Sequence, residues 1–147
     1  MKILIINGPN INMLGIRETN IYGTTTYSDM INLYQKWSKE ENIDILTYQS
    51  NHEGDLIDRI QQAYYEKVDG IIINPGAYTH TSIGILDALK SVMIPAVEVH
   101  ISQVDDRESF RKISYVREYC LKTITGMGIE GYRRGLLFLK KYLGGKI

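Results

Sequence analysis

The stretch VEVHIS (97–102) places a carboxylate, an imidazole and a hydroxyl at alternate positions. Side chains alternate between two faces along a strand, so Glu98, His100 and Ser102 would share one face. A carboxylate two positions from an imidazole can bond one ring nitrogen, fix the tautomer and leave the other nitrogen free to give a proton. The spacing therefore predicts a general acid with its own orienting carboxylate.

Two other interpretations of this stretch are open from the residues alone. An edge strand with one polar face turned to solvent would show the same alternation. A metal site with two histidines and one carboxylate, formed by His80, His100 and Glu98, is the other, although no close histidine spacing supports it.

The glycines of GMGIEG (126–131) match the dinucleotide-binding pattern G-x-G-x-x-G. Only sixteen residues follow this stretch, which is too few to complete a strand–helix–strand unit with its ribose-binding acid. We expect these glycines to allow a tight turn and close packing of a helix on the sheet. The single cysteine, Cys120, lies in a predicted strand and has no CxxC partner, so a core position is favoured over a nucleophile.

Length and charge narrow the class of protein. A chain of 147 residues fits one domain with a real core. The chain has 17 basic residues (lysine and arginine) and 17 acidic residues (aspartate and glutamate), so its formal net charge is zero. A zero net charge argues against a nucleic-acid partner and is compatible with self-association. No apolar run approaches the ~18 residues of a membrane span, and MKILIINGPN does not resemble a signal peptide. We expect a cytoplasmic protein without a membrane partner.

The apolar pattern alternates between strand and helix periods. Short apolar runs predict strands at residues 2–7, 43–49, 70–74 and 94–102, and the stretch 119–128 holds a fifth. Helical spacing predicts helices at residues 28–42, 53–68, 81–92 and 130–143. Asn51 is the expected N-cap of the second of these helices. Such alternation indicates an α/β fold with right-handed crossovers, here a flavodoxin-like, doubly wound five-stranded parallel sheet with helices on both faces.

Two long connections, at residues 8–26 and 103–118, each follow a predicted strand. Loops beyond about a dozen residues in a compact domain are usually functional or disordered. Open parallel sheets bind ligands beyond the carboxyl ends of their strands. The two loops, together with residues 74–82, supply asparagine, arginine, tyrosine and histidine side chains, so we expect a small-molecule site at this edge.

Five motifs along the chain resemble those of the type II 3-dehydroquinate dehydratases: NGPNINMLGIRETNIYG, SNHEGDLID, NPGAYTHTS, VEVHIS and EGY. They occur in order over nearly the whole chain. The resemblance implies loss of water from 3-dehydroquinate to give 3-dehydroshikimate, in the shikimate or quinate pathway, without a metal or other cofactor. It also implies one catalytic domain over residues 1–147, a lid loop at about residues 16–24, and a homo-oligomer, a dodecamer built from trimers.

The same resemblance implies catalytic roles for five residues. Tyr22 corresponds to the tyrosinate that removes the proton alpha to the ketone, and Arg17 to the arginine that helps to ionise it. Asn10 corresponds to the asparagine that holds a water against the enolate oxygen. His100 corresponds to the acid that protonates the departing hydroxyl, and Glu98 to the carboxylate that orients it.

Further positions match residues that grip the hydroxyls and carboxylate of the substrate: Asn74, His80, the backbone at Ile101, Ser102 and Arg111. Asp87 matches an aspartate that reaches into the site of a neighbouring subunit. Other residues depart from the usual pattern of the family: Thr19, Leu86, Gln103, Ile113 and the segment VREYCLKT (116–123), which lacks a small, proline-containing start. We expect these departures to affect subunit contacts, the lid and the turnover rate rather than the reaction.

Two rival functions come from other classes of protein. A non-catalytic flavin-binding module could have the same fold, but its phosphate cradle would use small donors rather than PNINMLG after the first strand. A scaffold that had lost activity is the second rival. The presence of Tyr22, Arg17, Glu98 and His100 together argues against it.

Overall fold

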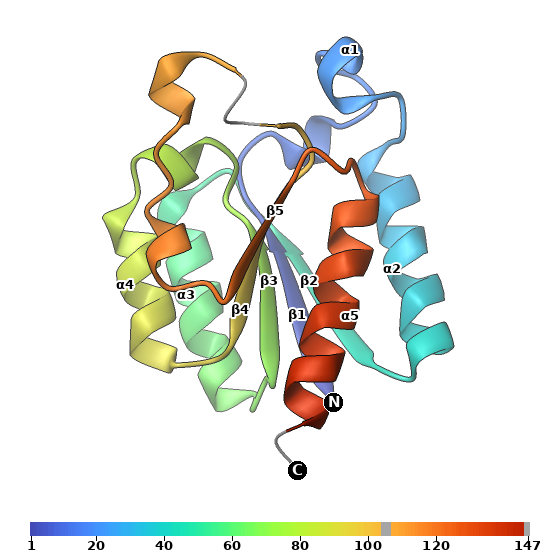
Figure 1. Cartoon of the computed structure of the whole chain (residues 1–147), viewed down its shortest axis with the longest axis vertical. Helices are drawn as coiled ribbons and strands as arrows, with labels where there is room; N and C mark the ends of the chain where they lie inside the picture. Colours follow the sequence, from blue (N-terminus) through green and yellow to red (C-terminus); the bar gives the residue numbers. More distant parts are fainter. Residues whose placement is uncertain (104–106, 146–147) are drawn as a thin grey trace.

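The computed structural model describes residues 1–103 and 107–145, apart from the side chain of Tyr22. Its centre is a parallel sheet with the strand order β2-β1-β3-β4-β5 (Figure 1). The strands are β1 (Lys2–Asn7), β2 (Asp44–Gln49), β3 (Gly70–Asn74), β4 (Ala96–His100) and β5 (Lys122–Thr125). The predicted flavodoxin-like, five-stranded parallel sheet is confirmed.

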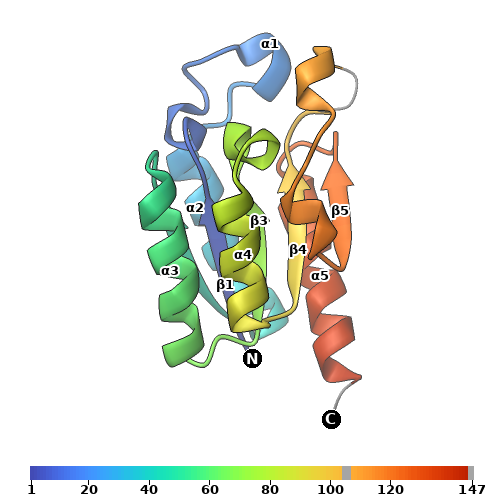
Figure 2. The same ribbon diagram turned by 90° about the vertical axis from the view of Figure 1, so that its left-hand side faces the viewer.

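Helices cover both faces of the sheet, as predicted (Figure 2). The α-helices of the described residues are α1 (Thr19–Tyr22), which lies beyond the strand ends, α2 (Tyr27–Glu41), α3 (Glu53–Tyr65), α4 (Ile83–Val92) and α5 (Glu130–Gly144). The helices α2 and α5 lie on one face, and α3 and α4 lie on the other. None of these helices has both the length and the apolar character needed to cross a membrane.

Two hydrophobic cores form because the strand side chains alternate between the faces of the sheet. Ile3 and Ile5 of β1 belong to the core beneath α2 and α5, whereas Leu4 and Ile6 belong to the core beneath α3 and α4. The central strands are therefore covered on both sides, and every residue of β3 and β4 is buried. This burial explains the continuous apolar runs of the sequence.

β4 is an interior strand between β3 and β5, so the interpretation of VEVHIS as an edge strand is wrong. The strand is also shorter than the predicted residues 94–102, because its pairing with β5 ends at His100 and Thr125. Beyond that point, Ile101 and Ser102 accept backbone hydrogen bonds from Gly128 and Gly126. Both residues thus lie just past the carboxyl end of β4.

The GMGIEG segment makes the turn between β5 and α5 and carries no strand–helix–strand unit. Gly126 and Gly128 have φ angles of 74° and 59°, which favour glycine. A Cβ atom on Gly131 would lie 3.3 Å from Val99 Cγ1, so this glycine lets α5 pack closely on the sheet. Both expected roles of these glycines, turn and packing, are confirmed.

Two local predictions are wrong. Helix α3 begins after His52, and Asn51 does not cap it. The Asn51 side-chain oxygen instead accepts from the backbone N–H of Asn10 at 3.0 Å and from Gln49 Nε2 at 3.2 Å, which ties the end of β2 to the loop after β1. Cys120 lies before β5 rather than in it, although it still packs against the core.

Candidate active site

A cavity of about 110 Å³ lies at the carboxyl ends of β1, β3 and β4. Its lining includes Arg17, just before α1, and Arg107 and Arg111, and Figure 1 shows α1 and the 107–111 loop at the same end of the molecule. Eight of the predicted site residues line it: Asn10, Arg17, Asn74, His80, His100, Ile101, Ser102 and Arg111. The prediction that sequence-distant loops converge at this edge of the sheet is confirmed.

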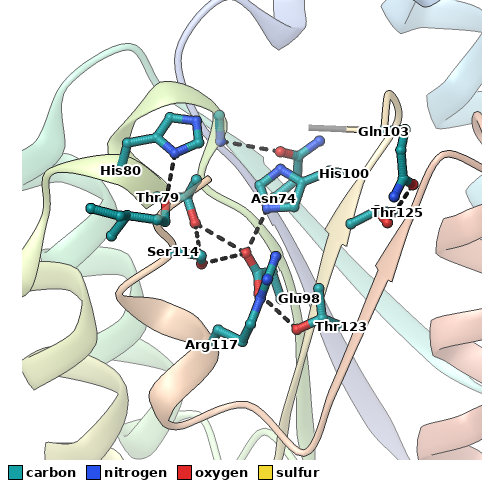
Figure 3. Close-up of polar contacts among 12 residues, drawn as sticks. Asn74, Thr79, His80, Glu98, His100, Gln103, Ser114, Arg117, Thr123 and Thr125 are labelled. Carbon is teal, nitrogen blue, oxygen red and sulfur yellow. Dashed lines mark hydrogen bonds and ion pairs between the residues drawn. The ribbon is translucent and has the colours of Figure 1, made fainter. Parts of the chain in front are cut away.

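His100 lines the cavity, and the buried Glu98 side chain, which does not line it, bonds to its ring (Figure 3). His100 Nε2 lies 2.6 Å from Glu98 Oε1, and the exposed fractions of the two residues are 4% and 0%. A carboxylate accepts hydrogen bonds, so Nε2 carries the donated proton. Because the ring also lines the cavity, Nδ1 is the nitrogen left for a ligand.

The Glu98 carboxylate receives hydrogen bonds from five side chains (Figure 3). Oε1 accepts from His100, Thr79 and Ser114, and Oε2 accepts from Thr123 and Arg117. Burial, the largest influence, raises the pKa of this carboxyl, but the hydrogen bond and charge of His100 and the hydroxyls of Ser114 and Thr123 outweigh it and lower the pKa to about 2. The carboxylate is thus held ionised.

His80 presents a defined nitrogen to the same cavity. Its Nδ1 lies 2.6 Å from the Ile113 carbonyl oxygen, which can only accept, so Nδ1 is the donor (Figure 3). Burial lowers the pKa of His80 and favours the neutral ring. A neutral ring with a proton on Nδ1 offers Nε2 as an acceptor, which suits a ligand hydroxyl. The contact uses the backbone of Ile113, so the departure from the family pattern at this position does not remove it.

A second buried network orients Asn74. Its Nδ2 donates to the Tyr132 hydroxyl at 2.8 Å, and its Oδ1 accepts from the Gly76 N–H at 3.1 Å. The Tyr132 hydroxyl donates in turn to Asn7 Oδ1 at 2.6 Å. The Asn74 amide is therefore fixed, with one N–H and one lone pair left for a ligand.

The loops after β1 and β3 are pressed together beside the cavity. A Cβ atom on Gly8 would lie 2.3 Å from the Pro75 carbonyl oxygen, and the Gly8 N–H donates to the Asn74 carbonyl at 2.7 Å. Asn10 follows with a φ of 70°, its N–H held by Asn51. These contacts fix the path of the backbone that brings Asn10 to the cavity.

Three arginines line the cavity, which favours an anionic ligand. Arg17 Nη2 lies 2.6 Å from Glu18 Oε2, and Arg111 Nε lies 2.7 Å from Glu108 Oε2. Arg107 Nε lies 3.9 Å from the same Glu108 oxygen. Arg107 was not assigned a role from the sequence, although its position in the long loop after β4 was a signal.

The roles of Asp87 and Tyr22 stay predictions in this single chain, and the metal alternative is not supported. Asp87 is exposed on α4 and does not line the cavity, so its expected role depends on a neighbouring subunit. The side chain of Tyr22 lies outside the described residues. The metal set of His80, His100 and Glu98 is not assembled: the described part of the chain holds no group of three metal-ligating residues.

The partners of Glu98 were missed in the sequence, apart from His100. Thr79, Ser114, Arg117 and Thr123 come from three separate segments with no shared spacing. Only Thr123 had a usable signal, because it is the register partner of Glu98 on the neighbouring strand. Aligning the sequences of β4 and β5 in the parallel sheet pairs Glu98 with Thr123.

Several known proteins are similar to this chain over nearly its whole length. The family model described as dehydroquinase class II matches residues 1–140. The 3-dehydroquinate dehydratase of Caldicellulosiruptor saccharolyticus is 54% identical over 143 residues, 97% of this chain and 99% of the relative. That of Lachnoclostridium phytofermentans is 56% identical over 132 residues, 90% of this chain and 91% of the relative. The crystal structure of a type II dehydroquinase from Butyrivibrio crossotus, 53% identical, superposes with a TM-score of 0.94 over 95% of this chain and 97% of that one.

Proposed function

The chain belongs to the class II dehydroquinase family, and we propose that its cavity converts 3-dehydroquinate into 3-dehydroshikimate through an enolate intermediate. The protein is thus a type II 3-dehydroquinate dehydratase. The observation that carries the proposal is the 2.6 Å contact between His100 and Glu98, set in the wall of an arginine-lined cavity. Such a pair supplies the acid that loss of a hydroxyl requires.

The first step removes the proton alpha to the ketone, and we assign this role to Tyr22. A free tyrosine has a pKa of about 10, so a tyrosine base at neutral pH needs a nearby cation. Arg17 is always charged and comes from the same loop, five residues earlier. Its place in the cavity wall supports this assignment.

The second step holds the enolate that forms when the proton leaves. Charge develops on the former ketone oxygen, where donors placed in advance are most effective. We assign to Asn10 the water that donates to this oxygen. The left-handed conformation of Asn10 and the bond of its N–H to Asn51 support a fixed position for this residue.

The third step expels the hydroxyl. Hydroxide is a poor leaving group, so the protonated His100 ring gives its Nδ1 proton to the departing oxygen as the carbon–oxygen bond breaks. The electron pair of the enolate forms the new double bond, and water leaves. His100 returns to the neutral ring, while Glu98 continues to hold Nε2–H.

Substrate binding uses the remaining cavity residues. A planar guanidinium such as that of Arg111 suits bidentate binding of a carboxylate. Ser102 and the backbone at Ile101, just past the end of β4, add polar contacts. Neutral His80 accepts from a substrate hydroxyl, and Asn74 offers its remaining N–H.

The proposal extends to the setting of the enzyme: a cytoplasmic protein whose residues 1–147 form one catalytic domain, with a lid at about residues 16–24. It extends also to a homo-oligomer, a dodecamer built from trimers. The exposed position of Asp87 on α4, together with exposed apolar side chains such as Ile83, supports contact with a neighbouring subunit. Analytical ultracentrifugation tests the assembly, and a stable monomer with full activity would contradict it.

The reaction is tested with purified protein and 3-dehydroquinate in metal-free buffer, by following the ultraviolet absorbance of the conjugated enone product. We expect a rise with the unmodified protein and almost none with Tyr22→Phe, which removes only the base. Ligand-induced thermal stabilisation of the variant should remain, because binding is retained. A folded Tyr22→Phe variant with most of the original rate would contradict the role of Tyr22.

A further inference from the structure

Glu98 needs a counter-ion whose charge does not depend on the state of His100. The carboxylate is fully buried, and a buried charge without a partner is strongly destabilising. In the proposed reaction the His100 ring is charged before the hydroxyl leaves and neutral afterwards. At that moment the carboxylate loses the charge of its nearest cation.

Resting on that proposed function, we propose that Arg117 is the permanent counter-ion of Glu98. In this role it is a positioning residue that keeps the carboxylate ionised and aimed at His100 throughout the reaction cycle. Arg117 Nε lies 3.4 Å from Glu98 Oε2, a contact that Figure 3 shows beside the bond between Glu98 and His100. The guanidinium stays charged across the whole working pH range.

The division of contacts between the two carboxylate oxygens supports this role. His100 takes Oε1, whereas Arg117 and the Thr123 hydroxyl take Oε2. Ligands on both oxygens prevent rotation of the carboxylate away from the imidazole. The hydroxyls of Thr79 and Ser114 stabilise the negative charge but carry no positive charge of their own.

The backbone segment that carries Arg117 is held in place by packing and hydrogen bonding. It belongs to the short helix η5 (Val116–Glu118), whose first residue is fully buried. Just before this helix, the Tyr115 N–H donates to the Thr79 carbonyl at 2.9 Å, which ties the segment to another Glu98 partner. The Arg117 side chain is 37% exposed, so its charge keeps contact with water and is less costly to bring to the site.

Within residues 1–103 and 107–145, His100 and Arg117 are the two side chains that form ion pairs with Glu98. Cys120 lies near the carboxylate, but burial and the Glu98 charge raise the pKa of its thiol, so it stays neutral. On the other side of His100, the cavity is lined by His80 and by three arginines, Arg17, Arg107 and Arg111. Those groups face the ligand. Arg117 is also in the segment that departs from the usual pattern of the family, so the resemblance does not supply this role.

Loss of Arg117 would leave the whole charge of Glu98 to the imidazolium. His100 would then hold its proton to higher pH and release it less readily to the leaving hydroxyl. We therefore expect Arg117→Ala to lower kcat by about threefold to tenfold with little change in KM. We also expect the alkaline limb of the pH profile of kcat to shift to higher pH by about half to one unit. This shift is smaller than the pKa change of about one to three units that a charge in direct contact with a titrating group causes.

The experiment compares Arg117→Ala with Arg117→Gln, which keeps size without charge, and with Arg117→Lys, which keeps the charge. Arg134→Ala, on the exposed face of α5, is the matched control. The readouts are pH profiles of kcat with 3-dehydroquinate and NMR titration of the three histidine rings. The signal assigned to His100 should titrate at higher pH in the Ala and Gln variants, and near the original pH in the Lys variant. His52, exposed and outside the cavity, should not move.

The result that overturns the proposal is a folded Arg117→Gln variant whose His100 titration and kcat profile both match the unmodified protein. A merely structural role would lower the melting temperature without moving either pH readout. If the unmodified protein fails to convert 3-dehydroquinate, the proposed function fails, yet the NMR titration still decides whether Arg117 acts on the Glu98–His100 pair.

Discussion

The imidazole of His100 is joined to the carboxylate of Glu98 by a 2.6 Å hydrogen bond between two positions on one face of an interior strand. The strand period fixes this geometry, because residues two apart point the same way. Burial of both groups excludes water from the bond. The result is an imidazole whose orientation is set by the backbone of the sheet rather than by a loop.

Replacement of His100 by alanine should separate the two halves of the reaction. Dehydration should fall by about a hundredfold to ten-thousandfold, the usual contribution of a general acid, because nothing else protonates the departing hydroxyl. Exchange of the alpha proton with solvent should continue, since the base and the enolate site are intact. Mass spectrometry of 3-dehydroquinate recovered from deuterated buffer measures this exchange, and its complete loss would show that His100 also positions the substrate.

Glu98 should make the stability of the fold sensitive to acid. Its folded pKa of about 2 lies below the usual value near 4.5, so its contribution is complete above that value and is lost as the pH falls from about 4.5 to about 2. The difference corresponds to about 3 kcal/mol in the free energy of unfolding. Urea unfolding at several pH values measures it. The Glu98→Gln variant should show a flatter dependence in this window, and equal slopes for the two proteins would contradict the assignment.

Loss of the Tyr132 hydroxyl should weaken both stability and substrate binding. Tyr132→Phe leaves Asn7 Oδ1 and Asn74 Nδ2 without their shared partner in a buried site, at a cost of about 1–3 kcal/mol. Without the Tyr132 hydroxyl the Asn74 amide loses its fixed orientation, so KM should rise by a larger factor than kcat falls. Tyr64→Phe, on an exposed tyrosine of α3, is the control. Unchanged denaturation midpoint and KM in Tyr132→Phe would show that the network is dispensable.

The close approach of the loops after β1 and β3 can be tested with two glycines. In Gly8→Ala the new methyl group would meet the Pro75 carbonyl at 2.3 Å, so the backbone must move, at a cost of at least about 1–3 kcal/mol. Because the Gly8 N–H holds the Asn74 carbonyl, activity should fall as well. Gly54→Ala, with open space around it at the start of α3, should be neutral or slightly stabilising. Thermal melting and initial rates of both variants provide the comparison.

Much of the fold was predictable because its signals are local. The buried strands β1 and β3 match the predicted boundaries, since both are continuous apolar runs ended by turn residues. The strand β4 was predicted too long, whereas β5 lies within the stretch 119–128 that was expected to hold it. Apolar residues continue past the last ladder pair, and the sequence alone does not show where pairing stops. Asn51 has the side chain of an N-cap but is used by the backbone of Asn10, a long-range contact that overrides the local preference.

The candidate site also has one part that was predictable from the sequence and one part that was not. His100 and Glu98 follow from strand period, and the family resemblance placed the eight lining residues that the cavity brings together. The ring of donors around Glu98 was out of reach, because Thr79, Ser114 and Arg117 are ordinary residues until tertiary folding brings them to one carboxylate. The tautomer of His80 likewise depends on a backbone carbonyl that carries no side-chain signal.

The hydrogen bond between Tyr132 and Asn7 joins positions that are 125 residues apart. During synthesis on the ribosome, every segment that lines the cavity emerges before α5 does. The Asn74 amide therefore gains its fixed orientation only when the last helix docks on the sheet. A nascent chain stalled before residue 130 would carry all of the cavity residues but lack this support, so the order of synthesis makes α5 the element that completes the cavity wall.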